Sequence, residues 1–228
     1  MQKNLLQLRG LRYAYALPDG SVRPVLDLPA FELSAGAQVA LEGVSGSGKT
    51  TLLNLIAGLL RAAPGMVRLS GQDLGALSEG SRDALRGRLI GLVQQTFNLL
   101  QGLSSLENVL LAQRLGGAYD PGRAEALLKR VGLGERLHDL PGRMSVGQQQ
   151  RVAVARALAC RPALILADEP TGNLDQTTGR EVLALLRGAA EESGAALLLV
   201  SHDPAVLKQF KRRLSLGALN RAARGGRS

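Results

Sequence analysis

A glycine-rich loop carries the residue types that bind the phosphates of a nucleotide. Residues 43–50 fit the pattern G-x-x-x-x-G-K-T, with Lys49 and Thr50 at its end. In this pattern backbone N–H groups surround the phosphates and the following helix presents its positive end. Lys49 would neutralise phosphate charge, and the Thr50 hydroxyl would hold Mg²⁺. The alternative is a glycine-rich turn without a ligand. The predicted nucleotide contacts are Gly43, Val44, Ser45, Gly46, Ser47, Gly48, Lys49, Thr50 and Thr51.

Two carboxylates follow an apolar run at 164–167, which reads as a buried strand ending at Asp168 and Glu169. Open α/β sheets bind their ligands at the carboxyl ends of the strands. Asp168 would hold Mg²⁺, and Glu169 would be the general base that accepts a proton from the water attacking the γ-phosphate. An acidic boundary between a strand and a turn is the alternative. The phosphate loop upstream favours catalysis.

His202 follows a second apolar run, at 195–200. If both runs are parallel strands of one sheet, the imidazole emerges at the same sheet edge as Asp168, within reach of the γ-phosphate. A lone histidine is more often structural or simply exposed. The sequence therefore offers His202 as a third candidate catalytic residue.

The segment Met144-Ser145-Val146-Gly147-Gln148 resembles the Leu-Ser-Gly-Gly-Gln signature of ABC cassettes, which phosphate-loop kinases and GTPases lack. With the loop, the carboxylates and His202 in this order, nearly the whole chain resembles the ATP-binding subunit of an ABC transporter. The resemblance implies that Ser145, Gly147 and Gln148, at a helix start, contact the γ-phosphate of ATP held by another subunit. An ordinary helix cap is the alternative for Ser145.

Two signature positions depart from the family pattern: Met144 replaces leucine, and Val146 replaces the first glycine. Methionine is a mild change. A β-branched valine where glycine is usual alters backbone freedom, so we expect activity that is retained but tuned.

The resemblance assigns roles to four further positions. His202 corresponds to the switch histidine, and Gln95 to the glutamine that touches Mg²⁺ or the attacking water, with Gln94 as its competitor. Asp175, in the sequence Thr-Gly-Asn-Leu-Asp, corresponds to the loop that crosses the dimer interface. Tyr15 is the candidate for stacking on adenine, with Tyr13 as the alternative.

Patterning predicts an α/β fold with a phosphate-loop ATPase core, in which a mostly parallel sheet carries the site. Short apolar runs from Leu5 to Leu41, with a turn at 17–20, indicate an antiparallel β subdomain. Further strands are expected at 39–41, 67–69, 90–93, 163–167 and 195–200, and helices at 81–88, 107–115, 123–131, 147–159 and 179–192. The whole chain reads as one nucleotide-binding domain, with a helical subdomain at about 96–158 inserted in the core and a disordered tail at 222–228.

The amino-acid composition indicates the type of core, the cellular compartment and the charge of possible partners. Aromatic residues make up 3% of the 228 residues, so the core must be aliphatic, which suits a buried parallel sheet. One cysteine, no signal-like amino terminus and no spanning apolar run predict a cytosolic chain. The net charge of +9 would attract anions, although the basic residues are scattered along the chain.

The resemblance also implies partners. Two cassettes would associate head to tail on two ATP molecules, and the homodimer would drive a separate integral membrane permease at the cytoplasmic face of the inner membrane. We expect docking near Gln95 and the segment 97–100. Phe-Asn-Leu-Leu at 97–100 and Thr-Gly-Asn-Leu-Asp at 171–175 look like the lipoprotein-release and macrolide-export branch. The alternative is a soluble ABC-type ATPase acting on nucleic acid or ribosomes; direct nucleic-acid binding is not expected.

Overall fold

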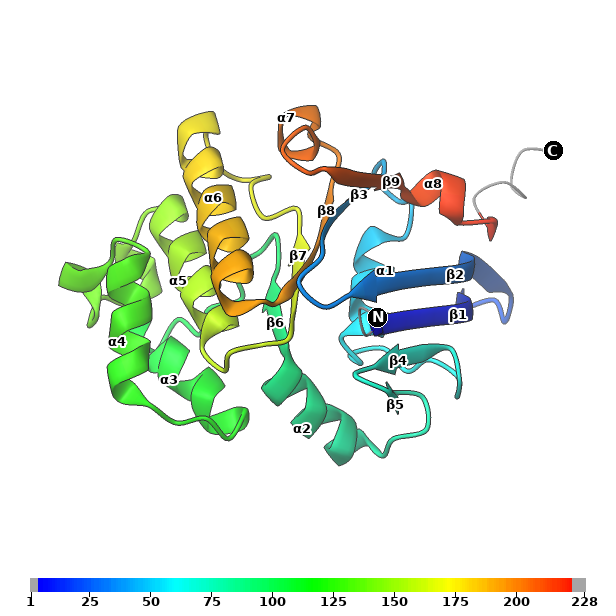
Figure 1. Ribbon diagram of the computed structural model, residues 1–228, viewed down its shortest axis with the longest axis horizontal. Helices are drawn as coiled ribbons and strands as arrows, with labels where there is room; N and C mark the ends of the chain where they lie inside the picture. The colour runs from blue at the N-terminus through cyan, green and yellow to red at the C-terminus, as the bar shows by residue number, and fades with distance from the viewer. Residues whose placement is uncertain (1–3, 223–228) are drawn as a thin grey trace.

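Two β-sheets with a helix between them form the framework of the protein (Figure 1). The structure is a computed structural model and describes residues 4–222. Helix α1 (Lys49–Ile56) contacts strands of both sheets, namely β2, β4 and β7. The expected disordered tail at 222–228 lies almost entirely outside the described residues.

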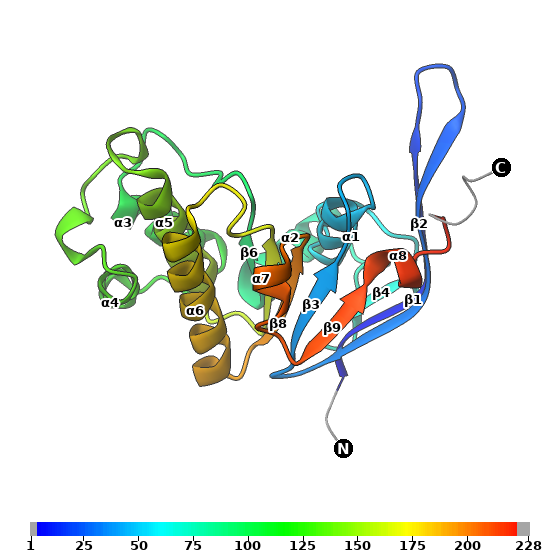
Figure 2. The same ribbon diagram turned by 90° about the horizontal axis from the view of Figure 1, so that it is seen from above.

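The first sheet is antiparallel, with strand order β2-β1-β4-β5. The predicted turn joins its two long strands, and the Leu17 N–H donates to the Ser21 carbonyl at 2.8 Å. Figure 2 shows this hairpin standing away from the rest of the molecule. The strands are β1 (Asn4–Ala16), β2 (Val22–Ser34), β4 (Val67–Leu69) and β5 (Gln72–Asp73).

The second sheet is parallel, with strand order β6-β7-β8-β3-β9. The order places the carboxyl ends of β3, β7 and β8 side by side, and these three strands lead into the phosphate loop, the acidic pair and His202. The sequence reading missed the edge strand β9, because its polar residues lack an apolar run. The strands are β3 (Gln38–Glu42), β6 (Ile90–Val93), β7 (Leu164–Asp168), β8 (Ala196–Ser201) and β9 (Arg212–Ser215).

Helices cover the parallel sheet and form a separate group between β6 and β7 in the chain. The group holds α3, α4 and α5 and lies at the left of Figure 1, where α6 also packs against α5. The bounds are α2 (Glu79–Leu89), α3 (Ser105–Leu115), α4 (Pro121–Arg130), α5 (Val146–Leu158), α6 (Gln176–Ser193), α7 (Pro204–Leu207) and α8 (Leu216–Leu219), with single 3₁₀ turns at Gly134–Arg136 and Pro141–Arg143.

The parallel sheet separates two aliphatic cores. On β8, Leu197 and Leu199 face the core shared with α3 to α6, whereas Leu198 and Val200 face the core shared with α1 and the antiparallel sheet. All four side chains are fully buried. Burying one such side chain stabilises the fold by about 1.5–3 kcal/mol, so the strands that carry the site are held firmly from both faces.

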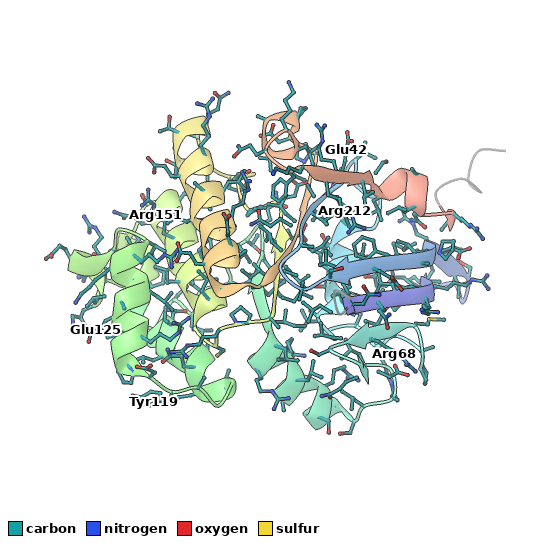
Figure 3. The ribbon with its side chains drawn as sticks, viewed as in Figure 1. Glu42, Arg68, Tyr119, Glu125, Arg151 and Arg212 are labelled. Carbon is teal, nitrogen blue, oxygen red and sulfur yellow. The ribbon has the colours of Figure 1, made fainter. Side chains whose placement is uncertain are left out.

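Charged side chains lie around the outside of this framework (Figure 3). The labelled Arg68, Arg151 and Arg212 come from β4, α5 and β9, in agreement with the scattered charge of the sequence. Arg151 pairs with Glu181 and joins α5 to α6. Across residues 4–222, none of the helices combines the length and the apolar character needed to cross a bilayer.

Candidate nucleotide-binding and hydrolytic site

A pocket of about 400 Å³ opens at the carboxyl ends of the parallel strands. It unites the antiparallel hairpin, the phosphate loop and the ends of β6, β7 and β8. The predicted residues that line it are Tyr15, Ser45, Gly46, Gly48, Lys49, Thr50, Thr51, Gln95, Asp168, Glu169 and His202. Residues widely separated in the chain therefore meet around one space.

The phosphate loop has the backbone conformation that only glycine adopts without strain. Gly46 and Gly48 have φ angles of +76° and +93°. A Cβ atom on Gly48 would also lie 2.9 Å from a methyl carbon of Leu26. Gly48 caps α1 without a side-chain hydrogen bond, so the N–H groups of the first turn are available to an anion.

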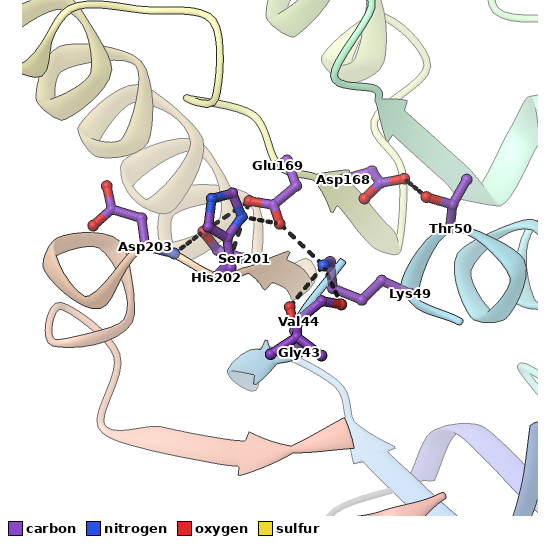
Figure 4. A network of polar contacts seen from close by, with 9 residues as sticks. All are labelled: Gly43, Val44, Lys49, Thr50, Asp168, Glu169, Ser201, His202 and Asp203. Carbon is purple, nitrogen blue, oxygen red and sulfur yellow. Dashed lines mark hydrogen bonds and ion pairs between the residues drawn. The ribbon is translucent and has the colours of Figure 1, made fainter. Parts of the chain in front are cut away.

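Lys49 is held inside the loop (Figure 4). Its Nζ donates to the carbonyls of Gly43 at 2.6 Å and Val44 at 3.1 Å, and it lies 3.3 Å from Glu169 Oε1. Only 9% of the residue is exposed. The lysine charge is thus already next to the loop that would wrap the phosphates, and triphosphate oxygens would exchange with the carbonyl partners.

Glu169 is the most constrained carboxylate of the site. Its Oε2 accepts hydrogen bonds from Ser201 Oγ at 3.0 Å and from the His202 N–H at 3.3 Å, while Oε1 lies 2.7 Å from His202 Nδ1. The residue is 6% exposed and has φ +45°. Such a φ angle in a non-glycine residue costs about 1–3 kcal/mol, which the surrounding bonds offset. The end of β8 therefore fixes the direction of this carboxylate.

Asp168 and Thr50 form the second polar pair of the site, because Thr50 Oγ1 donates to Asp168 Oδ2 at 2.7 Å. Burial raises the pKa of the Asp168 carboxyl and the neighbouring Glu169 raises it further, while the bond from Thr50 and the charge of Lys49 oppose the rise. A bound cation would relieve this cost of burying the carboxylate.

The donor set fits Mg²⁺. Asp168, Thr50 and Gln95 line the pocket and offer hard oxygen atoms. The described residues contain no cluster of three or more His, Cys, Asp or Glu side chains able to hold a metal.

The structure separates the two competing glutamines. Gln95 lines the nucleotide pocket, and its carbonyl accepts a bond from Asn173 Nδ2 at 3.0 Å. Gln94 instead lines a groove on another surface and bonds to Asn98. The position favours Gln95 for a role near the attacking water.

Tyr15 also lines the pocket and is 40% exposed, whereas Tyr13 is half-buried beside it. The two rings meet edge to face with centroids 5.1 Å apart, and the Tyr15 hydroxyl lies 3.3 Å from Thr51 Oγ1. The exposed ring of Tyr15 is therefore the one placed to stack on a base.

The signature-like residues do not line this pocket. Ser145 caps α5, and Ser145 and Gln148 form a reciprocal capping box with bonds of 3.3 and 2.9 Å. The ordinary cap considered for Ser145 is thus present. The exposed start of α5 therefore lies outside the pocket of its own chain. Asp175 likewise lies outside the pocket and caps α6, where bonds from Thr178 and Thr177 lower its pKa.

The sequence reading missed four contacts. Ser201 anchors Glu169, Asn173 anchors Gln95, and Arg23 and Val25 line the pocket. Ser201 could have been found because it separates a buried strand from His202. Arg23 could have been found only from the hairpin register, which pairs it with Tyr15.

Sequence comparison supports the geometry. The profile of the family described as ABC transporter matches residues 26–172. The chain is 43% identical to the lipoprotein-releasing system ATP-binding protein LolD of Chromohalobacter salexigens, over 96% of this chain and 94% of that protein. It is also 48% identical, over 92% of its length, to the macrolide export ATP-binding/permease protein MacB of Syntrophobacter fumaroxidans. The matched region is only 30% of that longer protein.

Solved structures agree with the fold. The chain is similar to the ATP-binding cassette MJ0796 in a dimeric post-hydrolysis state bound to ADP and Pi, with a TM-score of 0.85 and 33% identity. The match covers 96% of this chain and 95% of that one. A second dimeric structure of MJ0796 matches with a TM-score of 0.84 and 36% identity.

Proposed function

Because the chain belongs to the ABC transporter family, as an ATP-binding cassette that hydrolyses ATP, we propose that it drives a separate membrane subunit of the lipoprotein-release type. The observation that carries this proposal is similarity along the full length of LolD proteins, with 94% and 95% of two of them covered. The macrolide exporters match over only their cassette part, which makes them a weaker guide to the whole assembly.

The reaction follows from the side chains around the pocket. ATP phosphates enter the loop, and Lys49 exchanges its carbonyl partners for phosphate oxygens. Glu169 accepts the proton of the attacking water, Ser201 and His202 hold its carboxylate, and Gln95 orients the water. Thr50 and Asp168 would hold Mg²⁺, which supplies neutralisation of phosphate charge when bound.

A second copy of the chain would complete the site. The start of α5 carries Ser145, Gly147 and Gln148 but lies outside the pocket of its own chain. Its helix terminus suits an anion, so it would grip the γ-phosphate of ATP held by a partner in a head-to-tail dimer. The dimeric cassettes to which the chain is similar support this assembly.

The membrane subunit would dock in a groove between the ATPase core and the helical group. The groove is lined by α2, β6, α3 and α5, and its rim includes Leu59 and Leu115, which are 47% and 74% exposed. Arg156 of α5 donates to the Phe97 carbonyl at 2.7 Å and also to that of Asn98. The segment after Gln95 is thereby tied to the groove, so docking and nucleotide state would influence each other. This arrangement would hold the cassette at the cytoplasmic face of the inner membrane.

A pull-down tests the assignment. Tagged chain, incubated with detergent-solubilised membranes and ATP, should retain an integral membrane protein. Recovery of ribosomes or nucleic acid in place of a membrane protein would favour the alternative of a soluble ABC-type ATPase and would reject the proposal.

A further inference from the structure

Gln150 is a buried polar side chain that the catalytic residues do not account for. It lies on α5 and is 1% exposed. Its Nε2 donates to the Pro170 carbonyl at 2.8 Å, whereas its Oε1 is buried without a hydrogen-bond partner among residues 4–222. A buried amide that is only half satisfied costs stability. The bond that it does make is therefore the feature to explain.

Pro170 directly follows Glu169, the proposed general base. The backbone of this turn is strained at Glu169, with φ +45°, and is held by two other bonds. The Glu169 N–H donates to the Val200 carbonyl at 3.0 Å, and the Gly172 N–H donates to the Glu169 carbonyl at 3.0 Å. The Gln150 bond attaches this turn to α5.

The same helix is capped by Ser145, little more than one helical turn before Gln150. Its first turn also packs tightly on α6, because a Cβ atom on Gly147 would lie 2.7 Å from Thr178 Cγ2. The start of α5 and the turn after Glu169 are thus joined by one short stretch of helix and by the Gln150 hydrogen bond.

We propose that Gln150 is a positioning residue that couples the two ATP sites of the dimer. The inference rests on the proposed function, in which Ser145 grips the ATP of the partner while Glu169 acts on the ATP of its own chain. Engagement of α5 by the ATP of one site holds the Pro170 carbonyl, and with it the Glu169 backbone, in the reactive position of the other site.

The test replaces Gln150 with methionine, which has a similar shape but no hydrogen-bonding amide. Losing one neutral hydrogen bond predicts a fall in kcat of roughly three- to tenfold. The KM for ATP should stay within about twofold, because Gln150 is not a nucleotide contact. The Hill coefficient of ATP hydrolysis should fall towards one.

Gln113→Met is the matched control. Gln113 is also fully buried, with its Nε2 unpartnered among the described residues, but its Oε1 accepts a bond from the N–H of Asp120, the cap of α4, and not from the turn after Glu169. Both substitutions should lower the Tm, and only Gln150→Met should change kcat and cooperativity. Equal kcat and Hill coefficients in the two variants would overturn the inference.

Gln150→Asn covers the case in which the methionine variant does not fold, since asparagine keeps the polarity but is too short for the 2.8 Å bond. The same kinetic result is expected of it, and wild-type kinetics would count against the coupling. A wild-type protein without turnover or ATP-dependent dimerisation would remove the proposed function itself. If the folded Gln150 variants keep the cooperativity of the wild type, the coupling role of Gln150 is rejected and the proposed function stands.

Discussion

Glu169 Oε1 lies 2.7 Å from His202 Nδ1 and 3.3 Å from Lys49 Nζ, so one carboxylate oxygen joins three segments of the chain. The lysine comes from the phosphate loop, the glutamate from the end of β7 and the histidine from the end of β8. In the proposed reaction a triphosphate would take Lys49, and the Glu169 carboxylate would then keep only His202 and Ser201 as partners. Substrate binding would in this way free the proposed base.

Glu169→Gln should preserve ATP binding but lower kcat by at least about 100-fold, because the amide cannot accept the proton of the attacking water. The variant should also accumulate an ATP-bound dimer, visible by size-exclusion chromatography. Glu125→Gln, on the exposed surface of α4, is the control and should keep wild-type kinetics. An unchanged hydrolysis rate in Glu169→Gln would remove Glu169 from the role of base.

Ser201→Ala should lower kcat by about tenfold with little effect on the KM for ATP. Ser201 is fully buried, and its hydroxyl donates to Glu169 Oε2 at 3.0 Å. A hydrogen bond to a charged group contributes about 1.5–3 kcal/mol, and its loss leaves the carboxylate less well oriented. Steady-state kinetics decide the matter: a rise in KM without a change in kcat would assign Ser201 to nucleotide binding instead.

The sequence was sufficient to predict the parallel sheet and the order of the site segments, since the buried strands are short apolar runs. Helix starts were less accurate. The helices expected at 107 and 123 begin at Ser105 and Pro121, directly after the caps Ser104 and Asp120. The Ser104 and Glu107 capping box was readable in the sequence, so this error was avoidable.

Contacts across the fold could not be predicted in this way. The bonds from Gln150 to Pro170 and from Asn173 to Gln95 join residues with no shared periodicity or motif. They depend on how α5 and the loop after β7 pack on the sheet, which no local pattern encodes. Arg23 lines the pocket because the hairpin register places it opposite Tyr15, and no local pattern predicts that register.

Val146→Gly should leave the fold intact and change the ATPase rate or the affinity of the ATP-dependent dimer by about twofold or more. Val146 is 47% exposed at the start of α5, so its side chain lies outside the core and would meet the partner in the proposed dimer. Turnover assays and dimer titration with ATP measure the effect. Kinetics identical to wild type would show that the departure from the family pattern is neutral.

Gly147→Ala gives the contrasting result at the next position. The new Cβ would lie 2.7 Å from Thr178 Cγ2, so either the Thr178 side chain or the two helices must shift. Overpacking of this kind costs about 1–3 kcal/mol, and the Tm should fall along with turnover. A Gly147→Ala protein as stable as Val146→Gly would contradict the close packing of the two helices.

Asp168→Asn should abolish hydrolysis and raise the Tm of the nucleotide-free protein at neutral pH. Because burial raises the pKa of Asp168, the folded protein binds this proton more tightly than the unfolded chain. The wild type therefore loses stability as pH rises from the ordinary carboxyl range through the raised pKa, and the variant does not. The asparagine oxygen can still accept the Thr50 bond.

The measurement for Asp168→Asn is the Tm of both proteins across pH. The advantage of the variant should shrink as pH is lowered and the wild-type carboxyl becomes protonated. The carboxylates with lowered pKa, Asp175 and Glu107, are present in both proteins and cancel in the difference. A stability difference that does not vary with pH would contradict the raised pKa.

Leu115→Asp should separate ATP hydrolysis from membrane coupling. Leu115 is 74% exposed on the rim of the groove, so a charge there should change the folding free energy by no more than about 0.5 kcal/mol. The isolated variant should hydrolyse ATP at the wild-type rate, whereas an aspartate placed against an apolar partner surface should prevent co-purification of the membrane subunit. Val22→Asp, at 66% exposure on the hairpin, is the control that should still co-purify. Retention of the membrane subunit by Leu115→Asp would place the docking surface elsewhere on the cassette, and its loss from both variants would point to a general effect of added negative charge.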